Sequence, residues 1–170
     1  MNKKSLTLLF ALSLLFAVPA VAVEGPDDNV FHQITHHYET VRLLLVQDSV
    51  DGVPAQAKSI HEAVESLHVD FDPSKAGIDP AQAETFHQIL PELTRAARAL
   101  TKASDLASTR DAFYDLSKPL VRYRAVVASS ERPAVAYCPM ARRSWLQPEG
   151  EIGNPYHGQS MARCGNVVEN

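Results

Sequence analysis

The sequence has little of what most cofactors need. It contains two cysteines, three methionines and one tryptophan in 170 residues. It has no Cys-x-x-Cys-His motif, which argues against covalently attached haem, and no glycine-rich loop for a nucleotide phosphate. Residues 158–162 only approximate the nucleophile elbow of hydrolases and lack its strand-to-helix context. We therefore expect no haem, no nucleotide and no enzymatic activity.

Clusters of basic residues and long apolar runs are also missing. The net charge is −4 at pH 7 and no basic run is present, so we expect no nucleic-acid partner. The apolar run at residues 6–18 is short and ends in small residues, so we expect no stable membrane insertion. Because Lys3 and Lys4 precede this run and an Ala-x-Ala pattern follows at residues 20–22, we interpret residues 1–22 as a signal peptide for export.

Apolar residues recur every three or four positions through most of the remaining chain. This spacing gathers them on one face of a helix, and Asp, Gly and Pro mark the predicted helix ends. The predicted helices cover residues 27–48, 54–69 and 80–102, and a fourth begins within 104–109 and ends near 127. Because short connectors favour antiparallel neighbours, the predicted fold class is all-α, an up-down four-helix bundle over residues 23–129.

Residues 130–170 form a tail in which the helical period stops. The tail is rich in Pro, Gly, Asn and Arg and has too few apolar residues to fold alone. We expect it to pack on the bundle as part of one domain, in an irregular conformation with one extended segment around Val135 and Tyr137. The aromatic residues Trp145 and Tyr156 should lie against helix faces.

Both cysteines, and both methionines after Met1, lie in this tail. They form two short groups, Cys138 with Met140 and Met161 with Cys164. Residues two apart on an extended chain, or three apart on a helical turn, point in the same direction. Thiolate and thioether are soft donors that select Cu(I) over hard cations, so the spacing predicts a soft-metal site. A disulfide between the cysteines, with methionines filling apolar gaps, fits the spacing equally well.

The tail also resembles a known pattern. Its elements are Tyr137-Cys138-Pro139-Met140-Ala141, Trp145, Ile152-Gly153-Asn154-Pro155-Tyr156-His157-Gly158, Met161 and Cys164-Gly165. Together with residues 110–117 they are similar to a bacterial periplasmic domain family of unknown function, copies of which are fused to periplasmic adaptor subunits of heavy-metal efflux pumps. The resemblance implies a helical bundle followed by a Cys/Met tail, in the periplasm.

Two functional hypotheses follow from these observations. In the first, the protein binds Cu(I), or Ag(I), through Cys138, Met140, Met161 and Cys164, with His157 and Trp145 as possible additional members of the site. It would sequester the ion or deliver it to a periplasmic efflux adaptor or cuproprotein. In the second, the protein is an interaction module stapled by a disulfide, without metal.

Overall fold

The structure, a computed structural model, describes residues 29–130 and 132–169 of the chain. The predicted signal peptide lies outside these residues. Within them, no helix is both long and apolar enough to cross a membrane. The helices and strands are α1 (Val30–Val46), α2 (Val53–Val69), α3 (Pro73–Ala76), the 3-10 turn η1 (Pro80–Gln82), α4 (Ala83–Leu100), α5 (Leu106–Val126), β1 (Ala134–Cys138), β2 (Arg143–Gln147), the 3-10 turn η2 (Gly158–Ser160) and β3 (Asn166–Glu169).

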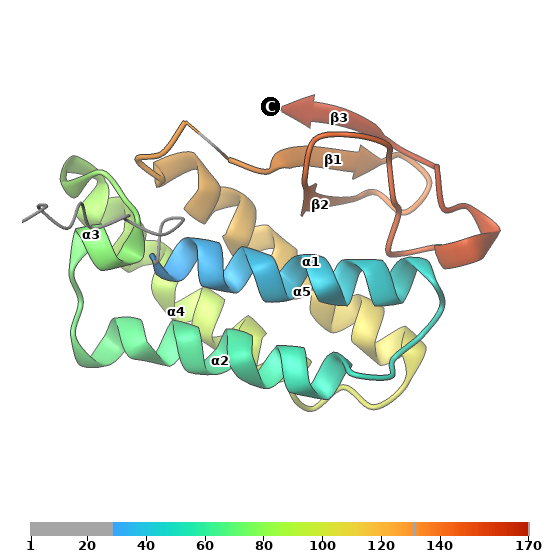
Figure 1. Ribbon diagram of the computed structural model, residues 1–170, viewed down its shortest axis with the longest axis horizontal. Coiled ribbons are helices and arrows are strands. Elements are labelled where there is room, and N and C mark those ends of the chain that lie inside the picture. Colours follow the sequence, from blue (N-terminus) through green and yellow to red (C-terminus); the bar gives the residue numbers. More distant parts are fainter. Residues whose placement is uncertain (1–28, 131, 170) are drawn as a thin grey trace, which may run out of the picture.

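Four long helices lie side by side around an apolar core. Figure 1 shows α1 and α2 running in opposite directions, and α1 packs on α2, α2 on α4, and α4 on α5. Aromatic rings from three helices meet at the centre: Phe31 and Phe86 lie 4.9 and 4.6 Å from the ring of Tyr123. Because each helix has one apolar face, the four faces together remove these rings from water.

Polar side chains and glycine fix the helix ends. The Asn29 side chain accepts a hydrogen bond from the His32 N–H at the start of α1, and Asp105 and Ser108 form a reciprocal capping box at the start of α5. Gly52 takes a left-handed conformation (φ 88°) before α2. The Asn29 and Asp105 side chains satisfy backbone N–H groups that the first helical turn leaves without intrahelical partners.

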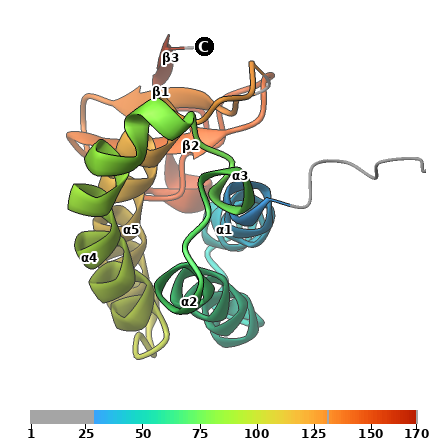
Figure 2. The same ribbon diagram turned by 90° about the vertical axis from the view of Figure 1, so that its left-hand side faces the viewer.

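The tail forms an antiparallel three-stranded sheet in the order β2-β1-β3. Figure 2 shows this sheet on one side of the helices, and β2 is the strand in contact with α5 and α1. Trp145 on β2 is fully buried. β3 is exposed along its length, but Arg124, a buried residue of α5, donates to the Glu169 carboxylate at 2.6 Å. The sheet therefore packs on the helices through β2, and β3 forms its exposed edge.

The prediction of an all-α four-helix bundle is wrong, because the three-stranded sheet makes the fold α+β. The predicted extended segment is β1, but the tail is not irregular around it: β2 pairs with β1 residue by residue, from Ala134 with Gln147 to Cys138 with Arg143. These strands do not alternate between buried and exposed positions, since β1 is buried at four of its five residues and β3 is exposed throughout. The sequence therefore lacks the period-two pattern of a half-buried strand.

One buried tyrosine joins the helices to the sheet. The Tyr38 hydroxyl accepts a hydrogen bond from the Leu146 N–H at 3.2 Å and lies 2.7 Å from the Ser117 hydroxyl. Burial raises the pKa of Tyr38 above its ordinary value. The substitution Tyr38→Phe should lower the free energy of unfolding by about 1–3 kcal/mol, because the Leu146 N–H would lose its buried partner.

Urea denaturation of Tyr38→Phe, with Tyr114→Phe as the control, measures this effect. Tyr114 is only partly buried, so its substitution should change the free energy of unfolding by less than about 0.5 kcal/mol. Equal stability of the two variants would contradict the proposed link between α1 and β2.

Candidate functional site

Cys138 is the last residue of β1 and has no exposed surface. The chain turns immediately after it to start β2. In this turn the Ala141 N–H points at the Cys138 sulfur, with 3.4 Å between N and Sγ, and Arg142 takes a left-handed conformation (φ 54°). Pairing of Cys138 with Arg143 closes the turn. Strand pairing on one side and a backbone donor on the other thus fix the position of this sulfur.

Cys164 approaches the same point from the loop before β3. Its N–H donates to the Met161 carbonyl at 2.9 Å, which forms a tight turn, and its Sγ lies 3.1 Å from Cys138 Sγ. Both thiols are free and Cys164 is half-buried. Gly165 has φ 138°, and a Cβ there would meet the Trp145 ring at 2.8 Å. A residue larger than glycine would therefore push this loop away from β1.

The surroundings of the two thiols shift their pKa values in opposite directions. Burial opposes ionisation of Cys138, but hydrogen bonds involving the Ala141 N–H, Cys164 and the Asn154 side chain together lower the Cys138 pKa below its ordinary value. The hydrogen bond to Cys138, followed by burial, raises the pKa of Cys164. The pair therefore ionises first at Cys138, with the Cys164 thiol donating to the Cys138 thiolate. Thiolate is the form of cysteine that binds metals and reacts with disulfides.

The two methionines lie in the adjoining turns. Met140 is two residues after Cys138 and 69 % exposed, so most of its side chain faces solvent. Met161 is partly buried, in the turn that its carbonyl closes with Cys164. The structure therefore brings two members of the predicted four-sulfur set into contact and leaves the other two in the turns on either side.

The additional residues of the prediction have different surroundings. Trp145 is buried and its Nε1 donates to Gln147 Oε1 at 2.9 Å, so its indole belongs to the packing of the sheet. His157 is partly buried, and its Nε2 has no hydrogen-bond partner among the residues that the structure describes. Across those same residues, no group of three or more His, Cys, Asp or Glu side chains is arranged to hold a metal ion.

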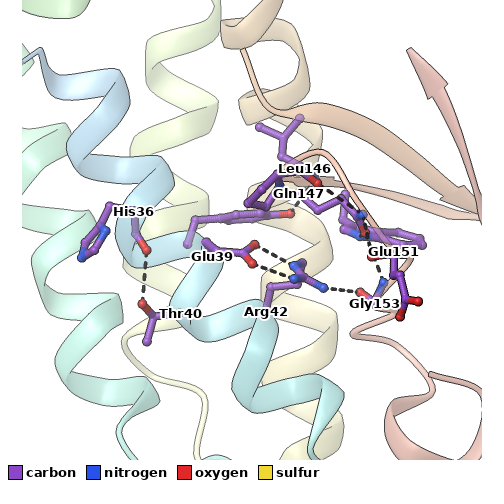
Figure 3. Close-up of polar contacts among 11 residues, drawn as sticks. His36, Glu39, Thr40, Arg42, Leu146, Gln147, Glu151 and Gly153 are labelled. Atoms are coloured by element: carbon purple, nitrogen blue, oxygen red, sulfur yellow. Dashed lines mark hydrogen bonds and ion pairs between the residues drawn. The ribbon is translucent and has the colours of Figure 1, made fainter. Parts of the chain in front are cut away.

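Sequence reasoning missed a polar network that supports the site. Figure 3 shows Arg42 of α1 between Glu39 and the tail: Arg42 donates to both Glu39 carboxylate oxygens, at 2.6 and 2.7 Å, and to the Gly153 carbonyl at 2.6 Å. The Gln147 side-chain oxygen accepts from the Gly153 N–H. The sequence signal was a charged residue next to Val41 on the apolar face of α1, because a buried Arg needs acceptors.

Comparison with known proteins gives no further assignment. Scans of protein-family models, of curated proteins and of solved structures found no match to this chain. The resemblance of the tail to the periplasmic family remains a prediction.

Proposed function

We propose that the protein binds a soft monovalent metal ion, Cu(I) or Ag(I), through the thiolates of Cys138 and Cys164. The observation that supports this proposal is the 3.1 Å approach of the two sulfurs. Two thiolates are a favoured donor set for Cu(I). An ion between them requires the sulfurs to move apart, and Cys164 lies in a half-buried loop that can shift more easily than the end of β1.

Met140 and Met161 complete the proposed site as thioether donors. A thioether binds without losing a proton, so it adds affinity for Cu(I) without adding negative charge. Because the Met140 side chain is exposed, its sulfur is the donor that an entering or leaving ion would contact from solvent. We propose a non-enzymatic role in the periplasm, where the protein sequesters the ion or delivers it to an efflux adaptor or cuproprotein.

The double substitution Met140→Leu, Met161→Leu should weaken Cu(I) binding by at least about 10-fold, the scale of damage to a metal's surroundings. Stability should change little, because leucine and methionine have similar volumes. The measurement is a competition titration against a chromogenic Cu(I) chelator under reducing conditions. Equal competition by the wild type and the double variant would show that the methionines are packing residues.

A second candidate function is an interaction module stapled by a disulfide. The same short distance favours it, because cysteines this close need little movement to form a bond. A count of free thiols in protein purified from the periplasm separates the two functions. Two thiols that Cu(I) protects from alkylation support the metal site, whereas two oxidised cysteines in the presence and absence of copper support the staple.

A further inference from the structure

Asn154 is a buried residue whose hydrogen bonds tie the Cys164 loop to the rest of the tail. It has no exposed surface. Its Nδ2 donates to the Cys164 carbonyl at 2.7 Å, and its backbone N–H donates to the Ala162 carbonyl at 2.7 Å. Its Oδ1 accepts from the Tyr156 N–H at 2.8 Å. Asn154 therefore forms hydrogen bonds to the turn that carries Cys164 and also to the turn that begins at Asn154.

The residues on either side of Asn154 are fixed to the helices and to the sheet. The Gly153 carbonyl accepts from Arg42 of α1 at 2.6 Å, and the Pro155 carbonyl accepts from Arg110 of α5 at 2.9 Å. The Tyr156 hydroxyl donates to the Ser144 carbonyl of β2 at 2.6 Å. Three elements thus hold the segment that carries Asn154.

The segment that carries Cys164 is held on its C-terminal side by the pairing of β3 with β1, which places Asn166 opposite Tyr137. On its N-terminal side the 3-10 turn η2, rather than a strand, precedes it. Cys164 is half-buried, and every residue of β3, which follows it, is exposed. Since Cys138 is fixed at the end of β1, the distance between the two thiols depends on what holds the Cys164 loop. We propose that Asn154 is the positioning residue that holds Cys164 beside Cys138, so that the two thiols act together. This inference rests on the proposed function only in that it takes the two thiols as the functional groups of the site.

The amide side chain suits this role because it donates and accepts at the same time. A carboxylate of the same size accepts but does not donate. Asn154→Asp therefore keeps the bond from the Tyr156 N–H. It loses the donor to the Cys164 carbonyl and to the Cys138 sulfur. Asn166→Asp makes the same charge change on exposed β3, two residues after Cys164, and is the matched control.

The test measures how readily the two thiols of the full-length protein form a disulfide in glutathione buffer. One glutathione disulfide accepts two electrons and two protons from the thiols and yields two glutathione molecules, so the equilibrium constant reports the effective concentration of one thiol at the other. We expect this constant to fall by about 10-fold in Asn154→Asp, the scale of one lost buried hydrogen bond. In Asn166→Asp it should stay within about 2-fold of the wild type.

A constant within about 2-fold of the wild type in a folded Asn154→Asp protein overturns the proposal. Asn154→Ser is the second variant, since serine can still accept a turn hydrogen bond from the Tyr156 N–H and adds no charge. Circular dichroism verifies the fold of each variant. Cu(I) competition on the same proteins should follow the same order. If the wild type binds no Cu(I), the proposed function fails, and the glutathione equilibrium still decides the role of Asn154.

Discussion

Replacing Cys138 with serine should reduce Cu(I) affinity by at least about 100-fold, more than the loss expected from the methionine substitutions, because even damage to the surroundings of a metal costs 10–100-fold. Serine stays protonated at neutral pH and its oxygen is a hard, poor ligand for Cu(I). Cys164→Ser should have a similar effect, since either substitution leaves one thiolate. The chelator competition used for the methionine variants measures both.

The stability of these variants separates the two functional candidates. If the wild type is purified with free thiols, Cys164→Ser should unfold at nearly the urea concentration of the wild type, because Cys164 is only half-buried. Cys138→Ser should unfold at a lower urea concentration in either case, because Cys138 is fully buried in the core. The Cys164→Ser variant is therefore the one that discriminates. If the wild type carries a disulfide, both variants should unfold at lower urea. Retention of tight Cu(I) binding by both serine variants would mean that the ion binds elsewhere.

Replacing Gln147 with leucine should lower the free energy of unfolding by about 2–4 kcal/mol. Its side-chain oxygen accepts from Trp145 Nε1 at 2.9 Å and from the Gly153 N–H at 3.2 Å, and its amide donates to the Glu151 carbonyl at 3.1 Å. Gln147 is 2 % exposed, so leucine would leave buried polar groups without partners, at about 1–3 kcal/mol each. Urea denaturation followed by circular dichroism measures the loss.

Gln159→Leu is the control for this substitution. The Gln159 amide also bonds to a backbone carbonyl, that of Val46 at 2.8 Å, but the residue is exposed and water replaces the bond. Its substitution should cost less than about 1 kcal/mol. A Gln147→Leu protein as stable as this control would contradict the view that the network in Figure 3 anchors the tail.

The helices could be predicted because each carries its own apolar period and end signals. The prediction of a helix over 54–69 is confirmed by α2 at Val53–Val69, and the predicted helix over 80–102 is α4 preceded by the 3-10 turn η1. The sheet could not be predicted in the same way. β1 and β3 become neighbours only when the loop that carries Cys164 returns to β1, and no local pattern of residues encodes that return.

The candidate site was predicted in part for a similar reason. The positions of the cysteines in the sequence indicated a shared site, and the two sulfurs lie 3.1 Å apart. The residue that bridges their two segments, Asn154, stood out in the sequence only as a member of the tail pattern Ile152–Gly158. Its role depends on the Cys164 carbonyl, ten residues away, and hydrogen bonds of this kind leave no periodic signal in the sequence.

Trp145 gives this protein an optical property of its own. It is the only tryptophan of the chain, and its ring is fully buried where β2 meets Gly165, the residue after Cys164. All indole emission therefore comes from one environment, at the contact between the sheet and the cysteine loop. Detachment of that loop would expose the ring to water and shift its emission to longer wavelength, so the unlabelled protein carries its own spectroscopic probe of this contact.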